Sequence, residues 1–197
     1  SYYLGSTNQG SVSNAGETIP ICTGVGMGRN LYNSGAFLTG DYAEVIVYNI
    51  VVNETQRTII ENYLAAKYAL TTSNDLYSFQ GSHPNEVAGI GQESSTDNHT
   101  TAKGTGAVTV AGASDLDNGE YLIWGHDNGA FASQSTELPV ALAGGSRLTR
   151  EWASDETGGD LGTVDITFDM SALSLGADPT EFRIITDSDG NFSNGNA

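Results

Sequence analysis

A short acidic loop near the end of the sequence carries oxygen-bearing side chains at a spacing that suits a hard cation. Residues 187–192 (DSDGNF) follow the strand-like run 182–185 (FRII). Ca²⁺ binds several carboxylate and carbonyl oxygens that a tightly turning backbone brings together. We therefore predict that Asp187, Asp189 and Asn191 bind Ca²⁺. The alternative is an Asx-turn between strands, which uses the same residue types.

Two further acidic loops have a related layout. Residues 126–131 (HDNGAF) follow the strand-like run 121–124 (YLIW), and we predict that Asp127 and Asn128 also bind Ca²⁺. Residues 115–120 (DLDNGE) form the third loop, and its predicted metal ligands are Asp115, Asp117 and Glu120. The Asp-Asn-Gly sequence of this third loop is also a good hairpin turn, so an ordinary turn is the alternative there.

Three cationic or titratable side chains are our candidates for ligand contact: His126, Arg147 and Arg150. The arginines are two of only seven basic residues, and a guanidinium can hold a carboxylate through two parallel hydrogen bonds. The alternative is that both arginines pair with carboxylates of the chain itself. A zinc site at His126 is not expected, because the other histidines lie in polar stretches without ligand spacing.

The sequence gives little support to catalysis. Asp155, Glu156 and Asp160 lie close together, and a carboxylate pair is what a glycoside hydrolase needs. Acidic residues are so common in this chain, however, that such a pair arises by chance. The Gly-x-Ser-x-Gly, His-Glu-x-x-His and P-loop patterns do not occur. We predict no catalytic residue and no enzyme, with a glycoside hydrolase as the less favoured alternative.

The composition restricts the partners of the protein. Seven basic residues against 24 acidic ones give a net charge of −17. Such a chain repels nucleic acid and anionic membranes, and it suits divalent cations. No run is apolar enough to span a membrane, and the single cysteine excludes an internal disulfide. We therefore expect no nucleic acid partner and no membrane insertion.

Hydrophobic periodicity predicts a mainly β protein with one helix. The helix is expected at residues 54–69, where apolar residues recur at helical spacing and Asn53 with Gln56 forms a capping-box pattern. Strands are expected at 2–4 and 41–49, and from residue 87 onward as short runs between Gly, Asp and Asn turns. Those later runs are 87–90, 107–110, 121–124, 148–152, 163–168 and 182–185, with a polar surface loop at 92–106.

Residues 40–49 (GDYAEVIVYN), followed by 55–57 (TQR) and 61–68 (ENYLAAKY), resemble the end of a laminin-G-like, concanavalin-A-like domain. Residues 26–30 (GMGRN) resemble the preceding strand of that family. The resemblance implies a β-sandwich of jelly-roll type whose last strand is followed by a helix. Most of that sandwich would lie upstream of residue 1, so the resemblance implies that strands come from a larger chain, from the second half or from another chain.

The stretch from residue 86 onward is similar to a β-sandwich module that follows the laminin-G-like unit in very large bacterial adhesins. The runs that carry the resemblance are 122–127 (LIWGHD), 147–152 (RLTREW), 156–158 (ETG) and 187–192. Giant Ca²⁺-dependent adhesins of the RTX type carry modules that bind peptides or sugars. The resemblance implies an extracellular, cell-surface location and a peptide or glycan on a host or neighbouring cell as the partner.

Together these observations predict a Ca²⁺-dependent module that binds a peptide or a carbohydrate as part of a larger bacterial adhesin. A structural spacer that Ca²⁺ rigidifies is the alternative. We expect a laminin-G-like segment at 1–70, a linker or loop at 71–85 and a β-rich module at 86–197. The two segments are also compatible with one continuous sandwich domain.

Overall fold

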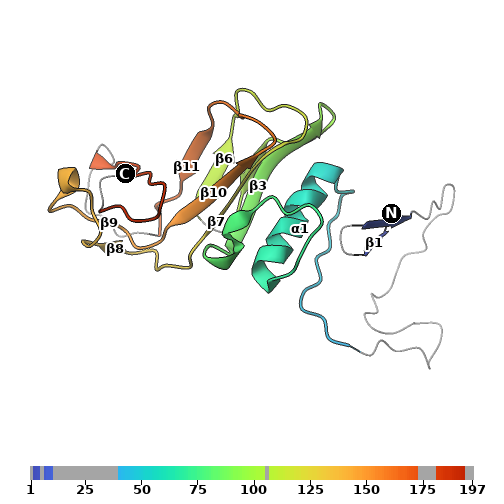
Figure 1. Cartoon of the computed structure of the whole chain (residues 1–197), viewed down its shortest axis with the longest axis horizontal. Helices are drawn as coiled ribbons and strands as arrows, with labels where there is room; N and C mark the ends of the chain where they lie inside the picture. Colours follow the sequence, from blue (N-terminus) through green and yellow to red (C-terminus); the bar gives the residue numbers. More distant parts are fainter. Residues whose placement is uncertain (1, 5–6, 11–39, 105–106, 173–180, 194–197) are drawn as a thin grey trace. The chain divides into compact units, whose positions relative to one another are not determined.

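The computed structural model describes residues 2–4, 7–10, 40–104, 107–172 and 181–193 (Figure 1). The chain divides into two compact units, Ser1–Val52 and Asn53–Ala197. The division falls earlier than the boundary expected near residue 70. The predicted helix therefore belongs to the second unit, because it packs on strands that follow it in the chain.

The first unit holds a short antiparallel pair, β1 (Tyr2–Leu4) and β2 (Thr7–Gly10). The strand predicted at 41–49 is wrong, since this stretch is irregular and Val47 is 83% exposed. A strand forms when a neighbour satisfies its backbone groups, and no described strand pairs with this one. Residues 26–30 lie outside the described residues.

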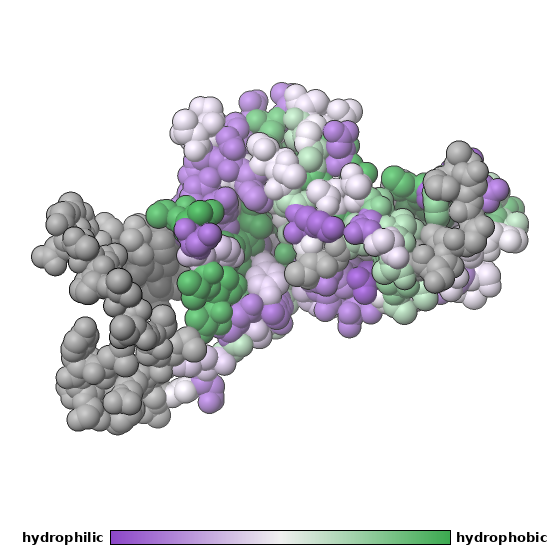
Figure 2. Space-filling view, turned by 180° about the vertical axis from the view of Figure 1, so that it is seen from behind, coloured by the Kyte–Doolittle hydropathy of each residue, from purple (hydrophilic) through white to green (hydrophobic). Residues whose placement is uncertain are grey.

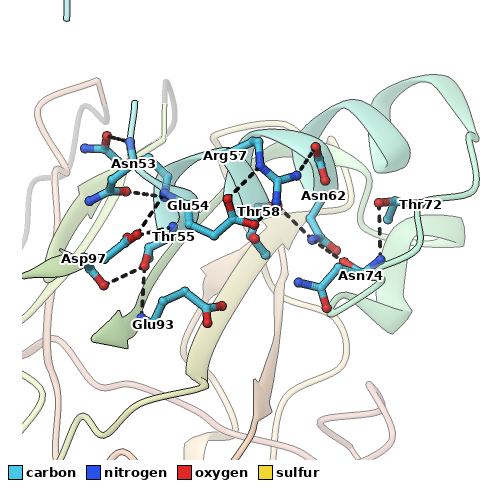
Figure 3. A network of polar contacts seen from close by, with 12 residues as sticks. Asn53, Glu54, Thr55, Arg57, Thr58, Asn62, Thr72, Asn74, Glu93 and Asp97 are labelled. Atoms are coloured by element: carbon cyan, nitrogen blue, oxygen red, sulfur yellow. Dashed lines mark hydrogen bonds and ion pairs between the residues drawn. The ribbon is translucent and has the colours of Figure 1, made fainter. Parts of the chain in front are cut away.

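The second unit begins with the only α-helix of the described residues, α1 (Glu54–Tyr68). The capping box is confirmed: Gln56 N donates to Asn53 Oδ1 over 2.8 Å, and Asn53 N donates to Gln56 Oε1 over 3.1 Å. A second acceptor for the helix terminus is the carboxylate of Asp97, which is distant in the sequence. It accepts from Glu54 N over 3.1 Å and from Thr55 N over 3.0 Å (Figure 3). This carboxylate therefore ties the helix to the sheet. No described helix is long and apolar enough to cross a membrane.

Two antiparallel sheets follow. The larger has the strand order β10-β7-β3-β4, and the smaller has the order β11-β6-β5. Their bounds are β3 (Asn85–Ser94), β4 (Asp97–His99), β5 (Thr101–Lys103), β6 (Val108–Ala111), β7 (Glu120–His126), β10 (Trp152–Thr157) and β11 (Asp165–Phe168). A small pair, β8 (Ser133–Gln134) and β9 (Arg147–Leu148), and the 3-10 turns η1 (Ser78–Gly81) and η2 (Val140–Leu142) complete the elements.

The core has two parts, one on each side of the β3–β7 pair. Tyr121 and Ile123 of β7 are buried in the cluster that contains Ile59 of α1. Trp124 of β7 is buried in the other cluster, with Val110 of the smaller sheet. Neighbouring residues of a strand point to opposite faces, so β7 supplies both clusters. The prediction of a mainly β sandwich with one helix is thereby confirmed.

Several strand predictions need correction. The expected loop at 92–106 contains two strands, β4 and β5. Asp97 of β4 accepts hydrogen bonds from the start of α1, and β5 pairs with β6. The expected strand at 148–152 is interrupted, since β9 ends at Leu148 and β10 begins at Trp152. The run 182–185 is not a strand, and Ile184 is 66% exposed. Figure 2 shows one face of the surface, on which hydrophobic residues lie among hydrophilic ones.

The Asp97 cap yields a prediction about stability. Burial opposes ionisation of this carboxyl, but the bonds from Thr55 and Glu54 outweigh burial and hold its pKa below the ordinary value. Asp97→Ala should lower the free energy of unfolding in urea by about 1–2 kcal/mol at neutral pH. Because the folded pKa is the lower one, this contribution is present above the unfolded pKa and is lost as the pH falls through the folded pKa.

The matched variant is Asp97→Asn, which keeps one oxygen acceptor and removes the charge. We expect its loss of stability to be smaller than that of Asp97→Ala. Equal stability of Asp97→Ala and the unchanged protein at neutral pH would contradict the assignment of Asp97 as a cap.

Candidate functional site

Two of the three acidic loops meet on either side of the segment 147–151, which joins β9 to β10. Asp127 Oδ1 accepts from Gly129 N over 2.8 Å and from Glu151 N over 3.1 Å. On the other side, the guanidinium of Arg147 lies 5.0 Å from the ring centroid of Phe192, the last residue of the 187–192 loop. The tertiary structure thus gathers the residues predicted for metal and ligand contact at one end of the unit, with the 115–120 loop as the exception.

Arg147 is held by carboxylates of its own chain. It forms ion pairs with Glu137 and with Glu151, the latter over 2.7 Å, and donates to the carbonyl of Leu148 over 2.9 Å. Only 8% of its side chain is exposed. Arg147 therefore pairs with carboxylates of the chain itself, which was the alternative to ligand contact. Its buried guanidinium stabilises the segment 147–151.

Arg150, by contrast, lies beside a buried histidine and a glutamate that sequence reasoning missed. Glu86 Oε2 is 3.0 Å from His126 Nε2 and 4.0 Å from a terminal nitrogen of Arg150. The guanidinium also donates to the Gly129 carbonyl over 2.9 Å and lies 5.7 Å from the ring centroid of Phe131. Three candidate polar groups from three separate segments therefore meet here.

The position of Glu86 depends on an unusual backbone conformation. Its φ is 53°, and the register between β3 and β7 shifts between Asn85 and Ala88. A β-bulge of this kind re-aims a side chain, and a positive φ is costly for a residue other than glycine. Nothing in the local sequence signals such a bulge, which is why Glu86 could not be found without the structure.

His126 is held as a neutral imidazole. Its Nδ1 accepts from Asn128 N over 3.0 Å, so its Nε2 carries the proton and faces Glu86. Burial lowers the pKa of His126, and the positive charge of Arg150 lowers it further. The contact with Glu86 raises it, but burial outweighs this contact, so the pKa lies below its ordinary value. The imidazole, only 2% exposed, stays uncharged at neutral pH.

The 187–192 loop is built from side chain to backbone bonds. Asp187 Oδ1 accepts from Asp189 N over 2.8 Å and from Asn191 N over 3.1 Å, and Asn191 Oδ1 accepts from Ser193 N over 3.2 Å. The second carboxylate oxygen of Asp187, Oδ2, is buried and has no hydrogen-bond partner. The loop is an Asx-turn that leaves one oxygen without a partner.

The 115–120 loop contains an ordinary turn, but it is not a hairpin, because it connects β6 of the smaller sheet to β7 of the larger one. Glu120 N donates to the Asp117 carbonyl over 3.2 Å, and Asp117 N donates to Glu120 Oε2 over 2.7 Å. Glu120 is 8% exposed and Gly119 has a φ of 86°. Asp115 N donates to the Leu161 carbonyl over 3.1 Å. This loop makes no contact with the other two that the structure records.

The described residues contain no group of three or more His, Cys, Asp and Glu side chains placed to hold a metal ion. The Ca²⁺ ligands therefore remain a prediction. Asp187 is the candidate that fits best, because its buried Oδ2 has no other partner. Additional ligands would have to be Asp189, Asn191, backbone carbonyls or water, which Ca²⁺ accepts.

The carboxylates considered for glycoside hydrolysis serve as backbone acceptors. Asp155 Oδ2 accepts from the backbone N and the hydroxyl of Ser78, the latter over 2.7 Å. Glu156 Oε1 accepts from Leu161 N over 2.6 Å, and Asp160 Oδ1 accepts from Gly162 N over 2.8 Å. Asp155 and Glu156 therefore connect β10 to neighbouring segments, and Asp160 closes a local turn.

Comparison with known proteins places residues 56–197 in a family described as a domain of unknown function, DUF8202. The match covers more than half of the chain, so the chain belongs to this family. No curated protein and no solved structure matches the chain.

The contact between Glu86 and His126 gives a prediction that can be measured directly. Glu86→Gln removes the carboxylate that favours the protonated imidazole, so the pKa of His126 should fall further. Titration of the imidazole resonances by NMR measures this. His99 of β4, whose pKa is lowered by burial alone, is the internal control and should titrate as before. An unchanged or raised pKa of His126 would contradict the contact.

Proposed function

We propose that this member of the DUF8202 family is a Ca²⁺-dependent ligand-binding module of a bacterial cell-surface adhesin and has no catalytic activity. One observation carries the metal part of the proposal. Asp187 Oδ1 is occupied by two backbone amides, while its Oδ2 is buried without a partner. A buried carboxylate oxygen that lacks a partner destabilises the fold, and a bound cation would remove this cost.

Asp187, Asp189 and Asn191 would hold the ion, with the second loop, Asp127 and Asn128, as the next candidate site. The ion would supply charge neutralisation and several coordination bonds to a loop made otherwise of Asx-turn contacts. Because Phe192 ends this loop against Arg147, ordering the loop also fixes the segment that contacts Asp127. A metal at one loop thereby stabilises the surface next to the other.

The ligand would be a peptide or a glycan, bound at the end where these loops meet. The side chains nearest to it are Arg150, 18% exposed, and Glu86, 30% exposed, with His126 beneath them. The setting in an extracellular adhesin rests on the laminin-G-like resemblance of residues 40–68 and on the net charge of −17. Such a charge suits a surface that encounters Ca²⁺ in the medium.

A rigidified spacer is the second candidate, and the state of the arginines favours it. Arg147 is saturated by Glu137, Glu151 and the Leu148 carbonyl, and Arg150 already donates to Gly129. A spacer would bind Ca²⁺ but no ligand. Arrays of peptides and glycans probed with the protein in Ca²⁺ distinguish the two functions. A ligand-binding module binds specific peptides or glycans on the array, and a spacer binds none.

The metal site predicts a thermal shift. The melting temperature should be higher in Ca²⁺ than in EDTA. An ion that binds only the folded state, at a free concentration 100 times its Kd, adds about 2.7 kcal/mol to the free energy of unfolding. Asp187→Asn combined with Asp189→Asn should abolish most of this rise. The control is Asp160→Asn, which alters an Asx-turn of the same type outside the predicted sites. An equal rise in the double variant and the unchanged protein would remove Asp187 and Asp189 from the site.

A further inference from the structure

Strand β11 has an open edge in the second unit. Of the other outer strands, β4 is covered by the start of α1, whose Asn53 and Thr55 side chains donate to the carbonyls of Asn98 and Asp97, while β10 pairs with β7 alone and contacts Ser78 through the Asp155 side chain. β5 runs against β3, since a Cβ added at Gly104 would lie 2.7 Å from the Glu86 carbonyl oxygen. β11 pairs with β6 alone within the described ranges (Figure 1).

The ladder shows which backbone groups face this open side. Asp169 N donates to the Ala107 carbonyl over 2.7 Å, so residue 169 belongs to a hydrogen-bonded pair. In an antiparallel ladder such pairs alternate with pairs whose groups point away. The N–H and C=O groups of Ile166 and Phe168 therefore point away from β6 and toward the open edge, where a further strand would bind.

The apolar face of β11 is incompletely covered at the same place. Ile166 lies opposite Val110, which is 3% exposed, and so it is on the face that packs into the core. Phe168 is on this face and packs against the core cluster, with its ring centroid 5.6 Å from that of Trp152. Ile166 nevertheless remains 47% exposed. An added strand with an apolar residue beside Ile166 would bury this side chain.

The charges at the edge select the partner. Asp165, Thr167 and Asp169 are exposed and lie on the outer face of β11. If two copies paired antiparallel about Thr167, Asp165 of one copy would lie opposite Asp169 of the other, and like charges directly opposite are destabilising. The net charge of −17 adds to this repulsion. A strand with basic residues on its outer face has the complementary charge.

We propose that the open edge of β11 binds an extended peptide in which basic and small polar residues alternate with apolar ones. The peptide would add a strand to the β11-β6-β5 sheet through the backbone groups of Ile166 and Phe168, which is a general mode of peptide recognition. Its apolar side chains cover Ile166, and its basic side chains lie beside Asp165 and Asp169, the second of which also contacts Lys103 over 3.5 Å. This site is separate from the Asp187 loop and requires no Ca²⁺.

The test uses the full chain and a synthetic peptide with the central sequence Lys-Val-Thr-Val-Lys, labelled with a fluorophore. Anisotropy should report saturable binding in EDTA as well as in Ca²⁺. Hydrogen exchange followed by NMR should show the amides of Ile166 and Phe168 exchanging fast in the unbound protein and slowly in the complex. The amide of Thr167, which faces β6, should be protected in both states.

Two control peptides and a pair of variants make the test specific. Replacing either valine by proline, or both lysines by glutamate, should abolish binding, because each valine lies opposite Ile166 or Phe168 and proline removes its ladder donor, while glutamate reverses the charge. Asp165→Asn should weaken binding roughly two- to fivefold. Glu54→Gln on α1 makes the same charge change away from β11 and should leave the affinity unchanged.

Three results would overturn the proposal. The first is equal affinity for the lysine and glutamate peptides. The second is binding without slower exchange at Ile166 and Phe168. The third is the absence of binding together with a concentration-dependent dimer in sedimentation, which would make a second copy the occupant of the edge. Binding that disappears in EDTA would instead assign the peptide to the calcium loops and would leave the metal proposal intact.

Discussion

Burial of the β3–β7 pair on both faces is the constraint on which the second unit depends. Tyr121 and Ile123 pack against α1, and Trp124 packs against the smaller sheet. Neither the helix nor the three-stranded sheet can bury its apolar side alone, so each is held by this pair. The close fit leaves no room for larger side chains: a Cβ at Gly91 would lie 2.3 Å from the Tyr121 ring.

The same strand pair also determines the polar end of the unit. Regular pairing of β3 with β7 breaks between Asn85 and Ala88, and Glu86 takes a positive φ there. The break turns the Glu86 carboxylate toward His126, at the end of β7, and toward Arg150. The strain of the bulge is tolerated because the core on either side fixes both strands.

Many carboxylates of this acidic chain act as internal hydrogen-bond acceptors. Asp97 caps the helix, Asp127 joins two loops, and Glu120 closes its own turn. A carboxylate oxygen that accepts from an amide keeps a second lone pair, so this role does not prevent cation binding. Asp187 differs from these three carboxylates because its Oδ2 is buried without a hydrogen-bond partner. That difference is why it is the preferred metal ligand among the predicted residues.

The sequence by itself determined the helix with its capping box, the apolar runs that supply the core and the turn at 117–120, because each follows from the pattern of residues that are near neighbours in the chain. Strand 41–49 and run 182–185 had the right residues, but pairing is a property of the partner strand and not of the run. Asp97 contacts Thr55, which lies 42 residues before it in the chain. Glu86 contacts His126, which lies 40 residues after it. Only the tertiary structure decided these contacts and the open edge of β11, because they depend on which segments the packing of the core brings side by side.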